Sequence, residues 1–251
     1  GSIRWTSDAA VFILRAVGFP LSSRPPEPTA TGPRERLFGL SPRLAALARL
    51  VPPGVPMADV GTDHALLPAA LLAAGHVPRA VGVDRAEAPL ASARRRWGGA
   101  IPAGLALRRG VGLEPLAPGE ATTVVLAGFG AKAMRGMLAR DRLAALGVER
   151  VVTQPTAGLP GLRAHLAEAG WLAVEETIVR EGRRGFISSA FVRGPARALD
   201  PLEALVGQVS RDEPLLRDWL EAQLHHLARV GPSAADLRAQ VVQVLDGLAL
   251  G

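Results

Sequence analysis

Residues 58–64 read Ala58-Asp59-Val60-Gly61-Thr62-Asp63-His64, and this stretch decides how the chain is expected to fold. It places an acidic, glycine-bent loop at the end of one apolar run, and a second apolar run ends at Asp84. In an open α/β sheet, such residues at the ends of neighbouring strands meet at one edge, where nucleoside-bearing ligands are held. The stretch therefore predicts an α/β fold with a ligand site after its first strand.

Strands and helices alternate on either side of this stretch. Apolar runs predict strands at 55–60, 80–83, 105–108, 122–127, 150–153, 172–179 and 186–192, and helical spacing predicts helices at 41–51, 66–74, 86–97, 131–138 and 160–169. Strands separated by helices imply a parallel sheet, whereas the tight turn at 182–185 makes the last two strands antiparallel. This order favours a Rossmann-like, seven-stranded methyltransferase-type sheet over the six-stranded sheet of a dehydrogenase.

Three regions differ in composition. Residues 1–38 are predicted to be an N-terminal extension and linker, with a short helix near 5–18 followed by a segment rich in Pro, Ser and Thr. Residues 39–194 carry the α/β pattern and are predicted to form the catalytic domain. Residues 195–251 show helical spacing at 216–227 and 237–248, which predicts a C-terminal helical hairpin domain.

Charge and cysteine content limit the classes of partner. Residues 41–194 carry a net charge of +7 and residues 195–251 carry −3. A basic catalytic domain favours a polyanionic partner such as RNA. A genome whose base composition favours Arg codons over Lys codons throughout explains the excess of Arg equally well. The chain has no cysteine, and no apolar stretch reaches the ~18 residues of a membrane span. We therefore expect a cytoplasmic protein without disulfides or membrane contact, and a monomer is favoured.

The loop after the first strand selects the charge of its ligand. Gly61 permits a tight turn and the close approach of a ligand, Asp63 can accept from an amine, and Asp59 can support the loop. Dinucleotide sites instead need three glycines to seat a pyrophosphate, which two carboxylates would repel. The pattern favours a cation such as S-adenosylmethionine, with Asp84 accepting from its ribose hydroxyls.

Each of these residues also has a plainer interpretation. Asp59 could simply cap loop amides, and Asp84 could cap the following helix. For His64 an orienting or packing role is favoured over catalysis, and no other histidine lies at metal-ligand spacing, so no metal is expected.

From about Leu40 to its end, the chain resembles the bacterial tRNA adenine N(1)-methyltransferases that act on the adenine at position 22 of tRNA. The resemblance rests on "LSPRLAALARLVP", "ADVGTDHALLP", "AVGVD…APLASA", "GVGLEPLAPGEATTVVLAGFGAKAM" and "QPTAGLPGLRAHLAEAGW", in this order and spacing, followed by the two-helix tail. It implies a Rossmann-like catalytic domain, S-adenosylmethionine as methyl donor and tRNA as substrate.

The resemblance also assigns further positions, some of which depart from the family pattern. Gly110, Val111 and Gly112 stand at the cofactor loop where the family has an acidic "GDGL", so Val111 replaces a carboxylate expected to meet the cofactor adenine. The family's "GMGG" is here 128–131 and its "QPN" is 154–156. The family's tyrosine in the last hairpin is absent, and Phe186 stands nearby.

Methylation of an adenine ring nitrogen needs positioning rather than a strong base, because that nitrogen bears no proton. The predicted turns after the fourth and fifth strands, 127–131 and 154–156, fit this task. Ala127 and Gly128 would contact the cofactor, while Phe129 would stack on a flipped base and Gln154 and Thr156 would complete the catalytic site. Simple packing for Phe129 and a strand-end amide role for Gln154 are the alternatives.

Two arginine clusters are candidate phosphate contacts. They are Arg94, Arg95 and Arg96 at the end of one predicted helix, and Arg183 and Arg184 at the tip of the last hairpin. A solvated surface is the alternative for both. The sequence thus predicts a tRNA methyltransferase, with a non-catalytic RNA-binding relative and a small-molecule methyltransferase as alternatives.

Overall fold

The computed structural model describes residues 40–96, 98, 101–182 and 184–248, which belong to a compact unit beginning at residue 36. The expected extension at 1–38, including the helix near 5–18, lies outside the described residues. Within the described part, every helix is too short or too polar to cross a membrane.

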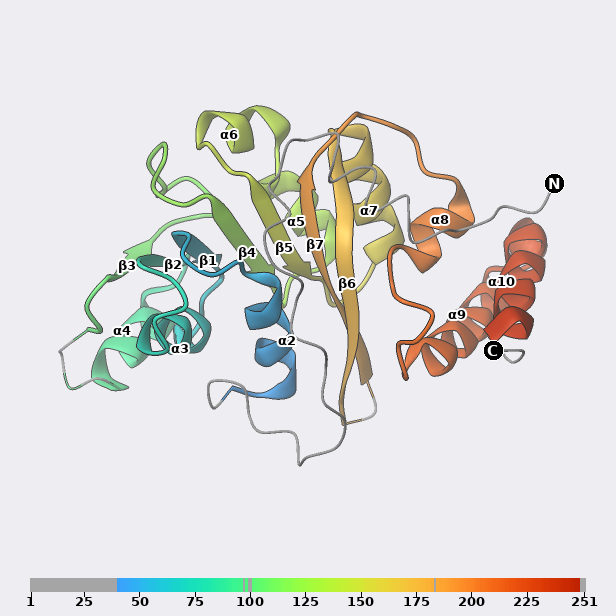
Figure 1. Ribbon diagram of the computed structural model, residues 1–251, viewed down its shortest axis with the longest axis horizontal. Coiled ribbons are helices and arrows are strands. Elements are labelled where there is room, and N and C mark those ends of the chain that lie inside the picture. The colour runs from blue at the N-terminus through green and yellow to red at the C-terminus, as the bar shows by residue number, and fades with distance from the viewer. Residues whose placement is uncertain (1–39, 97, 99–100, 183, 249–251) are drawn as a thin grey trace. The chain divides into compact units, whose positions relative to one another are not determined.

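Figure 1 shows the described elements in chain order. The strands are β1 Met57–Val60, β2 Ala80–Asp84, β3 Leu105–Arg109, β4 Thr123–Ala127, β5 Arg150–Gln154, β6 Trp171–Glu181 and β7 Arg184–Arg193. The helices are α2 Pro42–Leu50, α3 Leu66–Ala73, α4 Glu87–Arg96, α5 Ala131–Met137, α6 Arg140–Ala145, α7 Leu159–Glu168, α8 Pro201–Val206, α9 Leu216–Val230, the 3-10 turn η2 Pro232–Ala234, and α10 Ala235–Leu248.

The seven strands form one sheet in the order β3-β2-β1-β4-β5-β7-β6. Strands β1 to β5 are parallel, and β7 runs antiparallel to both β5 and β6. The strand order reverses between β1 and β4, and a ligand crevice is expected at the carboxyl ends of strands on either side of such a reversal. The Rossmann-like, seven-stranded methyltransferase sheet predicted from the sequence is confirmed.

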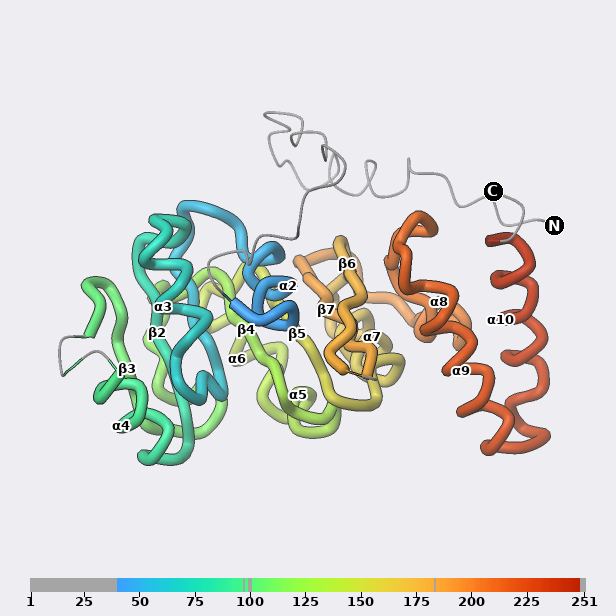
Figure 2. Tube along the Cα trace, turned by 90° about the horizontal axis from the view of Figure 1, so that it is seen from below, coloured from blue at the N-terminus to red at the C-terminus, as the bar shows by residue number. Residues whose placement is uncertain are grey.

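Apolar side chains cover both faces of the sheet, as a buried parallel sheet requires. In β4, Val124 and Leu126 pack into one cluster with α5 and α7, while Val125 packs into the other with α2 and α3. Figure 2 shows α2 and α5 on opposite sides of the strands. The alternation follows from strand geometry, because successive side chains point to opposite faces.

The C-terminal helices continue the protein beyond β6, the edge strand (Figure 1). Ile178 and Ile187 of the β6–β7 hairpin share a third apolar cluster with α7, α8, α9 and α10. A backbone bridge between Glu176 and Val209 adds to this contact. Helices α9 and α10 run side by side in Figure 2, as expected for a helical hairpin, whereas its status as a separate domain at 195–251 stays a prediction.

Short helices and strand ends differ from the sequence expectations. Helices α6 and α8 were not predicted, because six residues give too little periodicity to distinguish a helix from a loop. Strands β6 and β7 extend to Glu181 and Arg184, which pair with each other, so the hairpin turn is shorter than 182–185.

Candidate functional site

A cavity of about 820 Å³ lies along the carboxyl edge of the sheet. It runs from the loop after β3, past the ends of β2, β1 and β4, to Glu181 at the end of β6. Its lining includes every residue predicted to bind the cofactor, namely Asp59, Gly61, Thr62, Asp63, His64, Asp84, Gly110, Val111, Gly112, Ala127 and Gly128. The structure thus brings four separate sequence segments to one cavity.

The loop after β1 is tightly bent. Gly61 has φ 74°, and Asp63 and Ala65 adopt φ 51° and 53°, a conformation that non-glycine residues rarely take. The N–H groups of Gly61 and Thr62 both donate to the carbonyl of Val83, at 2.8 and 3.0 Å. Because β2 holds the loop in this way, its strain is maintained and the carboxylates are presented to the cavity in a fixed arrangement.

Phe129 fills the space that Gly61 leaves. A Cβ atom on Gly61 would lie 2.3 Å from the Cζ atom of Phe129. The glycine was expected to make room for a ligand at this point, and the structure instead places an aromatic ring from the β4 loop there. Phe129 is half-buried against the core and also lines the cavity. Its ring thus has a packing role, and base stacking stays a prediction.

Asp59 is a buried carboxylate in the cavity wall, only 6% exposed. The pKa of Asp59 is raised to about 6, chiefly by burial and also by the nearby charges of Asp84 and Asp63, while the hydrogen bond from Thr62 lowers it in part. That bond runs from Thr62 Oγ1 to Asp59 Oδ2 at 2.7 Å. A buried carboxylate with a raised pKa favours a bound cation, because the cation offsets the cost of ionisation.

Asp84 connects the end of β2 with the loop after β1. Its Oδ1 accepts from the N–H of Ala86 at 2.9 Å, which caps the following turn, and its Oδ2 accepts from the N–H of Asp63 at 3.3 Å. Asp84 therefore caps the turn just before α4, which begins at Glu87, and its side chain also lines the cavity. His64 Nε2 lies 3.6 Å from Asp63 Oδ1, which is compatible with an orienting role.

The loop after β3 closes the cavity with small and apolar residues. A Cβ on Gly110 would lie 2.2 Å from Pro115, and one on Gly112 would lie 2.9 Å from Met137. Both glycines are therefore required by packing within the protein. Val111 between them is 58% exposed on the cavity wall. Because the Val111 side chain is so exposed in the cavity, it offers apolar surface to a flat ring of a ligand.

Backbone hydrogen bonds join the loops after β4 and β5. Gly128 N–H donates to the Gln154 carbonyl, and Thr156 N–H donates to the Phe129 carbonyl at 2.8 Å. A Cβ on Gly128 would meet no atom within 4 Å, so a ligand can approach this backbone closely. Close approach is thus possible at Gly128, where the structure leaves space, rather than at the Cβ side of Gly61.

The predicted catalytic residues Gln154 and Thr156 are not among the described residues that line this cavity. Gln154 is fully buried, and its Nε2 donates to Ser188 Oγ at 2.7 Å. Its Oε1 accepts from Arg43 Nε at 2.9 Å. The amide is therefore engaged by side chains within the protein, and its contact with substrate stays a prediction.

Arg43 and Glu181 are site residues that sequence reasoning missed. Both line the cavity, and Arg43 Nη1 lies 3.5 Å from Glu181 Oε2. Their positions are 138 residues apart, one in the first turn of α2 and one at the end of β6. The cap at Ser41 predicts the helix, but no signal in the sequence places its first turn beside a hairpin tip.

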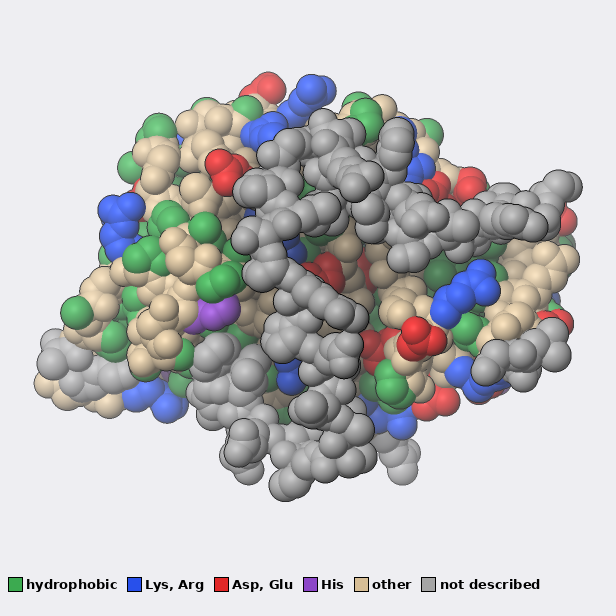
Figure 3. All heavy atoms as spheres, in the orientation of Figure 1, with side chains coloured by type: hydrophobic (Ala, Val, Ile, Leu, Met, Phe, Trp, Pro, Cys, Tyr) green, Lys and Arg blue, Asp and Glu red, His purple; other side chains and the backbone are tan. Residues whose placement is uncertain are grey.

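Four of the arginines predicted to contact RNA, Arg94, Arg95, Arg96 and Arg184, lie outside the cavity lining. Arg94 pairs with Glu87 at 2.5 Å, whereas Arg95, Arg96 and Arg184 are exposed. Arg183 lies outside the described residues. On the face drawn in Figure 3, basic and acidic side chains are interspersed over the coloured surface. The phosphate-contact role of these arginines stays a prediction.

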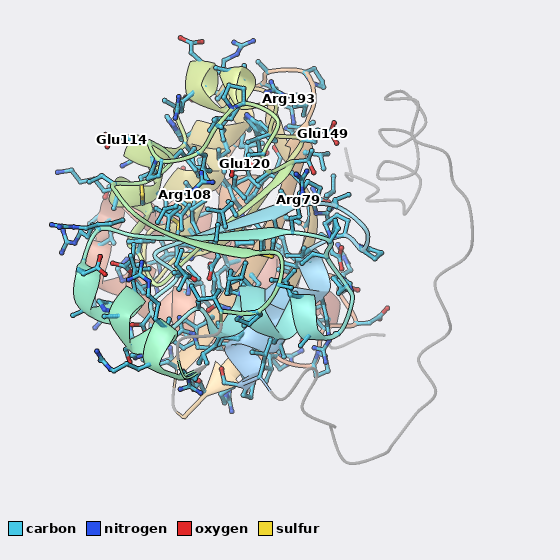
Figure 4. The ribbon with its side chains drawn as sticks, turned by 90° about the vertical axis from the view of Figure 1, so that its left-hand side faces the viewer. Arg79, Arg108, Glu114, Glu120, Glu149 and Arg193 are labelled. Carbon is cyan, nitrogen blue, oxygen red and sulfur yellow. The ribbon has the colours of Figure 1, made fainter. Side chains whose placement is uncertain are left out.

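Other arginines of the α/β region have structural partners. Figure 4 shows Arg108 from β3 near Glu120, and Arg108 Nη1 donates to Glu120 Oε2 at 2.7 Å. Hydrogen bonding by Arg108 holds the pKa of Glu120 below its usual range. Arg163 is likewise held by Glu176. The basic excess of this region is thus partly occupied in holding the fold together.

The donor set of the cavity suits an organic cation better than a metal ion. Asp59, Asp63 and Asp84 stand around the bent loop, but one is buried against Thr62 and another is capped by backbone amides. Within the described residues, no group of three or more His, Asp or Glu side chains is placed to hold a metal. Carboxylates beside an open glycine backbone and an apolar wall fit a cation that carries a ribose and a base.

A sheet of this order, with an acidic cavity at its carboxyl edge, defines the class of Rossmann-like proteins to which methyltransferases belong. The profile of the family described as "Methyltransferase domain" matches residues 40–187. The chain belongs to this methyltransferase-domain family.

A curated relative supports the comparison at the level of sequence. The tRNA (adenine(22)-N(1))-methyltransferase of Bacillus subtilis (strain 168) is 30% identical over 143 residues. The match covers 57% of this chain and 60% of the relative's length.

Solved structures share the fold. A candidate tRNA (m1A22) methyltransferase of Streptococcus pneumoniae in complex with S-adenosyl-L-methionine superposes with a TM-score of 0.71 at 23% identity, covering 83% of this chain and 99% of that one. TrmK of M. capricolum in complex with S-adenosyl-homocysteine gives 0.65 at 18% identity, covering 84% and 98%. Both cover most of the chain, so the fold extends through the C-terminal helices.

Proposed function

We propose that this protein is an S-adenosylmethionine-dependent methyltransferase that modifies an adenine ring nitrogen in tRNA. The observation that carries the proposal is the acidic cavity around Asp59, Asp63 and Asp84, where the pKa of the buried Asp59 is raised to about 6. A cationic cofactor would relieve this repulsion. The similarity to a tRNA (adenine(22)-N(1))-methyltransferase supports tRNA as the substrate.

Different residues of the cavity would contact different parts of the cofactor. Asp63 would face the amino-acid part of the cofactor, and the buried Asp59 carboxylate would offset the positive charge of the cofactor. Asp84 would accept hydrogen bonds from the ribose hydroxyls of the cofactor. Val111 and Met137 would offer apolar contact to the adenine. When bound, S-adenosylmethionine supplies a methyl group activated by its sulfonium.

The rest of the cavity would hold the substrate base. An adenine ring nitrogen carries no proton, so the protein needs to align it and exclude water rather than remove a proton. Phe129 extends from the turn after β4 to the acidic loop at Gly61 and would limit how deep the base can enter. Gln154 and Thr156 would act behind this surface, by holding Arg43 and the β4 loop respectively.

Two measurements test the proposal. Saturating S-adenosylmethionine is expected to raise the thermal unfolding temperature, since a ligand at 100 times its dissociation constant adds about 2.7 kcal/mol. Transfer of a labelled methyl group to unmodified bulk tRNA, followed by nucleoside analysis, is expected to yield N(1)-methyladenosine. Label on small molecules alone would favour a small-molecule methyltransferase, and RNA binding without transfer would favour a non-catalytic relative.

A charge-removing variant locates the cofactor site. Asp63→Asn is expected to weaken S-adenosylmethionine binding severalfold, because its exposed carboxylate faces the cavity. Asp141→Asn on α6 is the matched control, since Asp141 is exposed and lies outside the cavity lining. Equal binding by the two variants would argue against this placement of the cofactor. A cytoplasmic location and a monomeric state accompany the proposal as expectations.

A further inference from the structure

The cavity has a second polar end, opposite the three aspartates. There the lining comes from the first turn of α2, from the loop after β4 and from the end of β6. Its charged groups are Arg43 and Glu181, whose side chains are 26% and 46% exposed. Both can therefore be reached from the cavity.

Arg43 is held in place from three sides. Its Nε donates to Gln154 Oε1 at 2.9 Å, and its guanidinium lies 4.1 Å from the centroid of the Phe186 ring. Its Nη1 lies 3.5 Å from Glu181 Oε2. Gln154 is itself oriented by Ser188. A guanidinium fixed in this way loses little conformational freedom when it binds a ligand.

The pair presents a donor beside an acceptor with almost no net charge. A phosphate is a poor occupant, because the Glu181 carboxylate would repel it. A neutral base edge with one donor and one acceptor is the better match. Adenine has such an edge at N6–H and N7, which asparagine and glutamine amides read in the same donor-and-acceptor way.

We propose that Arg43 and Glu181 together read the N6–N7 edge of the adenine that is methylated. Glu181 accepts from the N6 amino group and Arg43 donates to N7. This arrangement leaves the N1 side of the ring free for methyl transfer, and it disfavours guanine, which shows two acceptors, O6 and N7, at the same edge. The inference rests on the proposed function and names the residues that choose the base.

Substitutions at the two positions are expected to affect different atoms of the base. Binding of adenosine, 7-deaza-adenosine and inosine is measured with full-length protein saturated with S-adenosylhomocysteine, so that the cofactor site is occupied. The native protein is expected to prefer adenosine over both analogues by about five- to a hundredfold. Arg43→Met should lose the discrimination against 7-deaza-adenosine, and Arg43→Lys, which keeps a donor, should restore part of it. Glu181→Gln should lose the discrimination against inosine.

Two exposed residues on the same elements provide matched controls. Arg49→Met alters α2 and Glu175→Gln alters β6, and neither residue lines the cavity. Both variants should keep the native preference. Thermal unfolding of each variant with and without S-adenosylmethionine separates loss of base reading from loss of the fold or the cofactor site.

Methylation of tRNA provides the second readout. Arg43→Met and Glu181→Gln should lower kcat/KM by about ten- to a hundredfold through KM, and the double variant should lose little more than either single one because both read one base. If the native protein is active and the kcat/KM of both variants equals that of the native protein, the inference is overturned and the proposed function stays intact. If the native protein transfers no methyl group, the proposed function fails. The inference is then judged by nucleoside binding, and absence of adenosine preference overturns it as well.

Discussion

The contact between Gly61 and Phe129 joins two loops that the sequence places far apart. Gly61 has φ 74°, and the ring lies where its side chain would be. The turn alone explains a glycine at this position, since left-handed backbone disfavours other residues. The ring adds a second and independent requirement for the same residue.

Gly61→Ala is expected to destabilise the protein by about 2–4 kcal/mol, because the backbone is left-handed and the new Cβ would lie only 2.3 Å from Phe129 Cζ. Gly128→Ala is the control, since it has φ 82° but open space around the Cβ position, and it should cost only about 1 kcal/mol. Urea unfolding measures both. Equal losses would show that the ring moves away at no cost.

The raised pKa of Asp59 predicts how the stability of the protein depends on pH. Its folded pKa of about 6 exceeds the ordinary 3.8, so the folded state binds this proton more tightly and the associated stability is lost as pH rises from about 4 to 6. Asp59→Asn, which keeps an acceptor for Thr62, should therefore raise the stability of the ligand-free protein at pH 7 by up to about 3 kcal/mol. Denaturant unfolding at pH 4.5 and 7.5 measures the difference.

The same substitution should have the opposite effect on cofactor binding. An ionised Asp59 attracts a cation, so S-adenosylmethionine affinity of the native protein should increase as pH rises through 6, whereas the Asn variant should bind more weakly with little pH dependence. Calorimetric titration at several pH values tests this. A variant that gains stability but keeps native affinity would place the cation elsewhere.

At the scale of elements, a buried ion pair fastens the C-terminal helices to the sheet. Arg163 on α7 and Glu176 on β6 are almost fully buried, with Arg163 Nε donating to Glu176 Oε1 at 2.9 Å. Arg163 also donates to the carbonyls of Ala204 and Leu205 in α8. One side chain therefore connects three elements, and its removal leaves the buried Glu176 carboxylate without its cationic partner, although Ser189 and the N–H of Gln208 still donate to it.

Arg163→Met is expected to lower the free energy of unfolding by about 3–5 kcal/mol. Arg180→Met is the comparison, because Arg180 pairs with Asp218 of α9 across a solvent-exposed surface, and it should cost less than about 1 kcal/mol. Chemical denaturation of both variants provides the measurement. A small effect of Arg163→Met would mean that water or α8 movement satisfies Glu176.

Elements with strong periodicity could be predicted, and short ones could not. The parallel strands, α3 and the two long C-terminal helices follow the expected patterns within a few residues. Helices α6 and α8 did not emerge, because their formation depends on packing of Leu143 and Leu205 into clusters made by distant residues. Local propensity carries little information for so short a segment.

At the scale of the whole molecule, the uneven distribution of charge predicts that tRNA binding depends on salt. The net +7 of residues 41–194 should make tRNA affinity fall by about ten- to a hundredfold between 50 and 200 mM salt, whereas S-adenosylmethionine affinity should change little. Replacing exposed Arg95 and Arg96 with Gln should reduce the salt slope by about one to two, as measured by filter binding.

The control replaces Arg211 and Arg229, exposed arginines of the acidic C-terminal segment, with Gln. If this pair reduced the slope as much as the Arg95 and Arg96 pair, the RNA would lie over the C-terminal helices instead. An affinity that is insensitive to salt would argue against phosphate contacts altogether.

The sequence by itself determined the class of the sheet and the loops that line the aspartate end of the cavity, because periodicity and glycine-bent loops act over a few residues. It also determined the acidic character of that end, through Asp59, Asp63 and Asp84. Only the tertiary structure decided which residues share the other end. Arg43 and Glu181 meet because α2 packs against the β6–β7 hairpin, and Phe129 meets Gly61 because β4 lies beside β1. Such contacts depend on the summed packing of the core, which no local pattern encodes.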